Sequence, residues 1–190
     1  MLGLFKLIES DVRAKAEWMY NSQSPRTLIK TLVADGTPTM LMYRLMQAAH
    51  KKKLVPVAML FNKLISWFGQ CGIGRGADFG PAFVITYSYG VGVGGHVVGG
   101  SHVVLMPHCT LAEQFVDQAK RGRTATKRCA PVLGDHVYVG TGARIIGPVK
   151  IGSHTKIGAN TVVLGDVPAG ASVLGVPAQI IWQKTVPPST

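Results

Sequence analysis

The fold of this chain is decided by residues 133–163, LGDHVYVGTGARIIGPVKIGSHTKIGANTVV, in which an aliphatic residue returns at every sixth position. A glycine often follows that residue, and Asp, His or Asn often comes shortly after it. Short strands that each send one large side chain inward and then turn a corner produce this period. Gly, Asn and Asp suit the corners because they tolerate unusual backbone angles. The stretch therefore predicts three-sided coils, three hexads each, stacked as a parallel β-helix.

The same period extends towards the N-terminus. Fourteen positions in steps of six are all apolar, which has a chance on the order of one in ten thousand. They are Ile73, Phe79, Ile85, Val91, Val97, Val103, Cys109, Leu133, Val139, Ile145, Ile151, Ile157, Val163 and Ala169. The expected inward positions between them, 121 and 127, are Arg121 and Lys127. We therefore expect residues 113–130 to leave the prism as a basic loop.

A different pattern precedes the repeats. Residues 9–20, 38–52 and 55–69 carry apolar side chains at helical spacing. The sequence predicts a mainly β protein with an α-helical region over 1–70. The β-helix is expected over 71–182, with its loop at about 113–130, and a tail over 183–190.

The composition limits the class of protein. The chain has 190 residues, 47% hydrophobic and 15% charged, which is typical of one folded domain rather than a disordered chain. Its net charge of +11 indicates an anionic partner. Three scattered cysteines predict neither a disulfide framework nor a metal site. With no signal peptide and no apolar stretch long enough to span a bilayer, we expect a cytoplasmic protein.

At this point the sequence resembles the hexapeptide-repeat acyltransferases, in their serine acetyltransferase-like branch. The resemblance rests on the coils from Tyr138 to Ile181, the Gly-Val-Pro-Ala signature at 175–178, Tyr43-Arg44-Leu45 in the helical region, and Ile-Gly-Arg-Gly at 73–76. It implies a left-handed β-helix, a homotrimer, acetyl-CoA as the acyl donor, and active sites between subunits.

The family's CoA groove corresponds here to Gly140, Thr141, Lys156, Gly158 and Ala159. Its catalytic residues have different counterparts. The family's Asp-His corresponds to Thr86-Tyr87, its Arg-His-Pro to Cys129-Ala130-Pro131, and its supporting acid to Gly72. The residues that bind and deprotonate serine in the family are therefore replaced in this chain.

Acyl transfer needs a base for the acceptor, and histidine suits that task near neutral pH. His136 and His154 are expected to stack on one corner as solvated residues. His96, His102 and His108 are expected to point outward, one on each face, with Asp78 stacked beneath His96. We favour His108 as the base, with Gly90 below it and Glu113 at the root of the loop orienting its imidazole. The sequence is equally compatible with His108 as a subunit-interface residue that takes no part in the chemistry.

The remaining expectations concern substrates and partners. Tyr87, Tyr89 and Arg128 are candidates for acceptor binding, and Arg123 for contact with the CoA phosphates. We expect an acetyl-CoA-dependent acetyltransferase acting on a sugar hydroxyl of a polysaccharide, glycolipid or nucleotide-sugar. The alternatives are serine O-acetylation, or a catalytically silent trimeric scaffold. Nucleic acid is not an expected partner. The apolar and basic helix at 51–68 either packs on the prism or lies against the inner face of a membrane.

Overall fold

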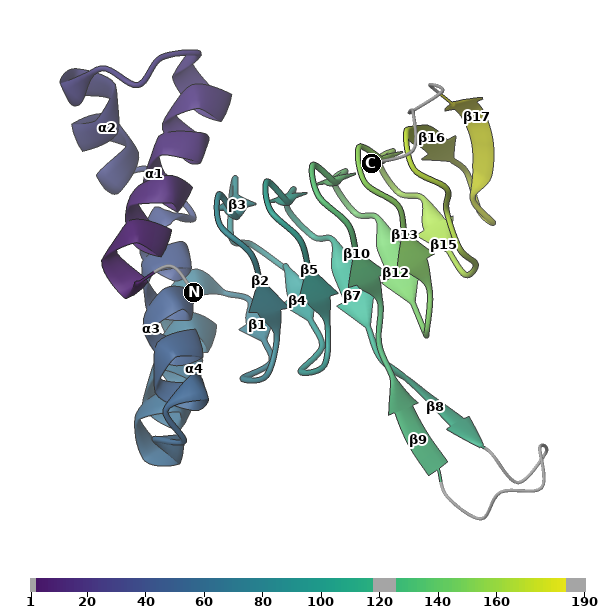
Figure 1. Ribbon diagram of the computed structural model, residues 1–190, viewed down its shortest axis with the longest axis horizontal. Helices are drawn as coiled ribbons and strands as arrows, with labels where there is room; N and C mark the ends of the chain where they lie inside the picture. The colour runs from purple at the N-terminus through teal and green to yellow at the C-terminus, as the bar shows by residue number, and fades with distance from the viewer. Residues whose placement is uncertain (1–2, 118–125, 184–190) are drawn as a thin grey trace.

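The structure, a computed structural model, describes residues 3–117 and 126–183. The described chain begins with four helices and continues as a three-sided prism of short strands, and the helices cover one end of the prism (Figure 1). The helices are α1 (Leu4–Tyr20), α2 (Pro25–Leu32), α3 (Thr37–Lys51) and α4 (Val55–Gly69). Proline stands in the first turn of α2, α3 and α4, where its missing N–H leaves no hydrogen bond unmade.

Three sheets of parallel strands form the sides of the prism. The first side contains β1 (Gly72–Ile73), β4 (Gly92–Val93), β7 (Thr110–Ala112), β12 (Arg144–Ile146) and β15 (Val162–Val163). The second contains β2 (Asp78–Phe79), β5 (Val98–Gly99), β10 (Val132–Leu133) and β13 (Lys150–Ile151). The third contains β3 (Val84–Ile85), β6 (Val104–Leu105), β11 (Tyr138–Val139), β14 (Lys156–Ile157), β16 (Ala171–Leu174) and the antiparallel β17 (Gln179–Gln183). This arrangement confirms the predicted fold class, a β-helix with helices at its N-terminal end.

The chain turns between these sides at three corners. The first corner joins the first side to the second, the second corner joins the second side to the third, and the third corner leads back to the first side. At the second and third corners the backbone repeatedly adopts a positive φ, as at His136 (φ 55°) and Asn160 (φ 55°). The prediction that Asp135-His136, Ser153-His154 and Ala159-Asn160 lie at corners is thereby confirmed.

The positions predicted to face inward are buried, but the predicted alignment of successive coils is wrong in part of the prism. Thirteen of the fourteen positions are buried, and Val167 rather than Ala169 faces inward in its coil. Gly72 pairs with Gly92, twenty residues on, whereas Gly92 pairs with Thr110, eighteen residues on. The first coil therefore has two extra residues at its third corner. Between this corner and the hairpin, the inward residues counted in steps of six stand just before the strands, and other inward residues lie within the strands.

An antiparallel hairpin leaves the prism at the first corner. Its strands are β8 (Gln114–Asp117) and β9 (Thr126–Cys129), and they extend away from the coils (Figure 1). Thr110 pairs with Arg144, thirty-four residues on, which is sixteen more than one coil. These sixteen residues and the two at the third corner together equal one coil, so the period of six is restored beyond the hairpin.

A buried ion pair fixes the helices to the first coil. The Arg44 guanidinium on α3 donates from Nε to Asp11 Oδ2 on α1 (2.7 Å) and from Nη2 to Asp11 Oδ1 (3.0 Å). It also donates to the backbone oxygens of Phe79 (2.7 Å) and Gly80 (2.5 Å). Asp11 Oδ1 in turn accepts from the Phe83 N–H (2.9 Å). Both side chains are buried, so each charge depends on the other.

We predict that Asp11→Ala lowers the free energy of unfolding by about 3–5 kcal/mol, because it leaves the Arg44 charge buried without its partner. Urea unfolding of the full chain measures this change. Glu9→Ala is the matched control, since it breaks the exposed Glu9–Arg13 pair on the same helix, and it is expected to cost less than about 1 kcal/mol. Equal losses in the two variants would contradict the role given to the buried pair.

Candidate functional site

The third corner brings several of the predicted site residues into one column. His108 is exposed there, with φ 59°, and its N–H donates to the backbone oxygen of Tyr89 in the coil below (2.9 Å). Its ring lies over Gly90, in the space that a β-carbon of residue 90 would need. Tyr87 and Tyr89, on the same corner in the coil below, are both partly exposed. The structure thus places His108 against Tyr89, at a corner and not on a face of the prism as expected, while the room above Gly90 is filled by His108 itself.

The predicted CoA-binding residues continue this column in the next two coils. The Gly142 N–H donates to the Pro107 oxygen (3.0 Å), and the Asn160 N–H donates to the Thr141 oxygen (2.8 Å). Thr141 and Ala159 are exposed at the corner. We call Tyr87, Tyr89, His108, Thr141 and Ala159 the corner column.

The two glycines and the lysine of the predicted CoA groove differ in their surroundings. Gly140 is buried, and a β-carbon on it would lie 2.8 Å from the Ala159 nitrogen. A β-carbon on Gly158 would collide with the Leu174 side chain. Close stacking of the coils therefore explains both glycines without a ligand. Lys156 on β14 is exposed and forms no ion pair within the described residues, so its charge is available to an anionic group.

The first corner carries a histidine–carboxylate pair. Glu113, at the root of the hairpin, accepts at Oε1 from the His96 N–H (2.7 Å), and the same oxygen lies 3.1 Å from His96 Nδ1. Glu113 is mostly buried, whereas the His96 side chain is 60% exposed. The expectation that Glu113 orients His108 is therefore not met, because the carboxylate contacts His96 on a different corner.

Other predicted positions also need correction or fall outside the description. Asp78 does not stack beneath His96; it pairs in register with Val98, and its carboxylate accepts from Lys51 Nζ (2.8 Å) and Gln47 Nε2 (2.7 Å). The prediction failed because the coil between them has twenty residues. Arg128 lies on β9 opposite Phe115, and Arg123 lies outside the described residues.

Three histidines stack at the second corner. The ring centroids of His102 and His136 are 4.4 Å apart, and those of His136 and His154 are 4.7 Å apart, with nearly parallel planes. His102 was expected on a face of the prism, and the stack instead places it on the same corner as the other two. Its backbone, like theirs, has a positive φ. Burial within the stack lowers the pKa of His136, and the two neighbouring imidazoles lower it further. The charge of Asp135 acts in the opposite direction.

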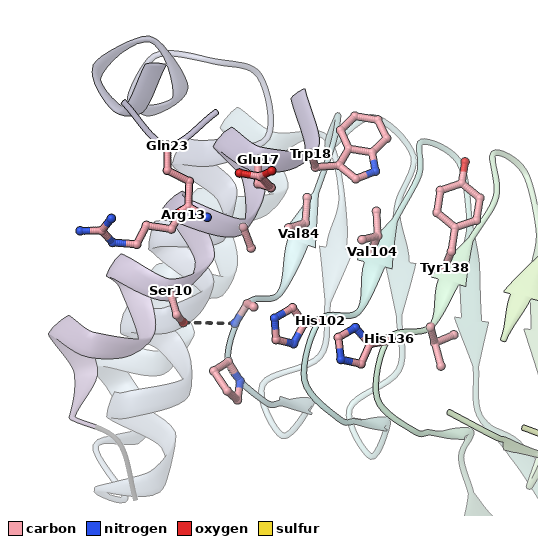
Figure 2. Close-up of a pocket in the computed structure, with 14 residues that line it drawn as sticks. Ser10, Arg13, Glu17, Trp18, Gln23, Val84, His102, Val104, His136 and Tyr138 are labelled. Atoms are coloured by element: carbon pink, nitrogen blue, oxygen red, sulfur yellow. Dashed lines mark hydrogen bonds between the residues drawn. The ribbon is translucent and has the colours of Figure 1, made fainter. Parts of the chain in front are cut away.

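A cavity of about 610 Å³ opens between α1 and the third side of the prism. Trp18 and Tyr138 lie along one edge of it, and His102 and His136 lie along the other (Figure 2). Val84 and Val104 form part of its floor. None of the residues predicted for catalysis or for CoA binding lines this cavity. The predicted stacking of His136 and His154 is confirmed, whereas the addition of His102 to the stack and the cavity beside α1 were not predicted from the sequence.

Two further observations concern a cysteine nucleophile and a bound metal ion. Burial raises the pKa of the Cys109 thiol to about 12, so this inward side chain acts as a core residue and not as a nucleophile. Within residues 3–117 and 126–183, no cluster of three His, Cys, Asp or Glu side chains is arranged to hold a metal ion.

Comparison with known proteins agrees with this fold. Residues 130–165 match the family model described as bacterial transferase hexapeptide (six repeats). The serine acetyltransferase of Helicobacter pylori strain 26695 is 30% identical over 179 residues, which cover 94% of each chain. Soybean serine acetyltransferase complexed with serine superposes with a TM-score of 0.80 at 29% identity, over 94% of this chain and 69% of that one. A serine acetyltransferase in complex with CoA superposes with a TM-score of 0.79 at 24% identity, over 94% and 69%.

The prism of hexapeptide coils, with its helical end and its hairpin, defines a left-handed β-helix acyltransferase. The chain belongs to the serine acetyltransferase family of these enzymes. The predicted family and its acyltransferase class are thereby confirmed. The names of the relatives favour the alternative acceptor, serine, over the predicted sugar hydroxyl, and they lend no support to a role in polysaccharide biosynthesis.

We predict that the free energy of unfolding falls as the pH is lowered from about 6.5 to 5. Because the pKa of His136 is lowered in the folded protein, the unfolded chain binds the proton more readily in this range. His136→Asn, which tolerates the positive φ, is expected to lose less stability between pH 7.5 and 5 in urea titrations than the wild type does. His50→Asn, on α3, is the control and keeps the wild-type difference. An unchanged pH dependence in His136→Asn would contradict the prediction.

Proposed function

We propose that this chain transfers the acetyl group of acetyl-CoA to the hydroxyl of a small acceptor, with L-serine as the first acceptor. The corner column carries this proposal, because it places an exposed imidazole directly below the two coils that hold the predicted donor-binding residues. The relatives that match nearly the whole chain are serine acetyltransferases, which supports serine as the acceptor.

The proposed active site needs two subunits. His108 lies at the third corner, whereas the hairpin with Arg128 leaves from the first corner, on the far side of β7. The side chains predicted to act on one acceptor are thus divided between two edges of the prism. A homotrimer, as the family resemblance implies, would place the hairpin of one subunit against the corner column of the next.

In this proposal, His108 is the general base. Its imidazole takes the proton of the acceptor hydroxyl while the oxygen attacks the thioester carbonyl carbon. The C–S bond breaks, the acetyl group forms an ester with the acceptor oxygen, and the proton passes from His108 to the departing sulfur. Thr141, Ala159 and Lys156 would bind the donor along the corner, with the Lys156 ammonium available to a phosphate.

A sugar hydroxyl is the second candidate acceptor, and a specific observation favours it. The positions that correspond to the family's Asp-His are Thr86 and Tyr87, and the Thr86 hydroxyl is buried, within hydrogen-bonding distance of the Leu105 oxygen (3.3 Å). Thr86 therefore presents no carboxylate and no free hydroxyl to the ammonium group of an amino acid. A neutral acceptor needs no such charge.

The acceptor is tested by incubating the full chain with acetyl-CoA and following the release of CoA thiol. Turnover with L-serine is expected, with D-serine and L-alanine as controls for stereochemistry and for the hydroxyl. Turnover confined to sugars or glycans would replace the first acceptor by the second. Thermal protection by CoA without turnover on any acceptor would overturn the proposed activity and favour the scaffold alternative.

The base is tested by substituting asparagine, which tolerates a positive φ, for histidine. His108→Asn is expected to lower kcat by about 10²–10⁴-fold, since that is the usual contribution of a general base. His154→Asn is the matched control, because His154 has the same backbone conformation (φ 60°) on another corner, and it is expected to keep kcat within a few-fold. A loss in His96→Asn but not in His108→Asn would assign the base to the His96–Glu113 pair instead.

A further inference from the structure

Helix α4 presents an apolar side to the surroundings of the protein. Trp67 is 73% exposed and Phe68 is 75% exposed, and neither packs into the core. The first two turns of the helix add further exposed apolar residues: Val55, Val57, Met59 and Leu60, with Leu54 just before them. Only Ala58, Ile65 and Gly69 of α4 are buried, on the side that faces α3 and β1. Such a run of large apolar side chains is unfavourable in water and is typical of a surface that binds something.

Basic residues border this surface. From Gly36 to Ala77 the sequence contains no Asp or Glu. Lys51, Lys52 and Lys53 form the turn that leads into α4, and all three are exposed. Lys51 pairs with Asp78, whereas Lys52 and Lys53 have no ion-pair partner among the described residues. The apolar side of α4 is therefore bordered by positive charge.

One lysine lies within the apolar side itself. Lys63 is exposed, three residues after Leu60 and four before Trp67, which makes these three side chains neighbours on the helix. A long lysine side chain can lay its methylene groups along an apolar surface and extend its ammonium group to phosphates. A second copy of the same surface would instead bring Lys63 and the lysine turn towards like charges. The charge therefore favours an anionic lipid surface over self-association.

We propose that α4 and the lysine turn form a membrane-surface site, in which the helix lies in the headgroup region of an anionic bilayer with Trp67 and Phe68 inserted. The bilayer would be bound and not crossed: no helix within the described residues is long and apolar enough to span one. The site is separate from the corner column, so it does not depend on the proposed acceptor.

The test is co-sedimentation of the full chain with vesicles. Vesicles of phosphatidylcholine with about one third phosphatidylglycerol are compared with vesicles of phosphatidylcholine alone. Binding to the anionic vesicles is expected, with weaker binding at high salt because the ionic contribution is screened. Trp67→Ser with Phe68→Ser is expected to weaken partitioning about tenfold or more, since it removes the two largest inserting side chains. Lys52→Gln with Lys53→Gln and Lys63→Gln is expected to remove the preference for anionic lipid.

The control is Ile29→Ser with Val33→Ser, two exposed apolar residues on and just after α2, and this variant should bind like the wild type. Absence of binding to both kinds of vesicle would overturn the proposal. So would a change of oligomeric state in Trp67→Ser/Phe68→Ser by light scattering, because α4 would then be a contact between subunits. Unchanged binding in that variant would also overturn it.

Discussion

The architecture depends on a conformational constraint at the corners. For coils to stack in parallel, the chain has to turn sharply within a few residues at each corner, and at two corners it does so with a positive φ in successive coils. At the second corner Ala82, His102, His136 and His154 share this conformation, and at the third corner Gly90, His108, Gly142 and Asn160 do. A positive φ costs a residue with a side chain about 1–2 kcal/mol, and Gly, Asn, Asp and His tolerate it best. The residue types that suit the corners are therefore also those that carry chemistry, and stacking places them in columns.

The fold was predictable because one physical signal dominates it. The inward side chains recur every six residues, and burial confirms nearly all of them. The register between successive coils was less predictable. The two extra residues after Ile85 and the sixteen near the hairpin together equal one coil, so the period of six continues unbroken in the sequence and hides the shift. This concealed displacement produced the errors on Asp78, His96 and His102. Asp78 had been placed beneath His96 by counting eighteen residues along the chain, and His96 and His102 had been placed on faces by counting in sixes. The Arg44–Asp11 pair joins residues thirty-three apart that no local pattern connects.

The candidate site was predictable in part. His108 was placed correctly above Gly90, because the coil from Gly92 to Thr110 has the expected eighteen residues. It had been placed on a face of the prism, however, and it lies at the third corner. Glu113 was assigned to the wrong imidazole, since its contact with His96 follows from how the hairpin leaves the first corner. The predicted glycines of the CoA groove are explained by coil stacking, so their presence alone does not indicate a ligand. Side-chain roles that depend on a second subunit do not follow from one chain.

The hairpin at the first corner carries a residue predicted to bind the acceptor, but it does not hold the coils of the prism together. Because β7 and β12 pair directly across it, the coils above and below are held in register by hydrogen bonds that do not involve the hairpin. Its length and sequence can therefore change without moving the third corner, where the donor is expected to bind. Evolution, or an engineer, can therefore vary this segment, and with it the predicted contacts of Arg128 with an acceptor, without taking apart the coils of the prism.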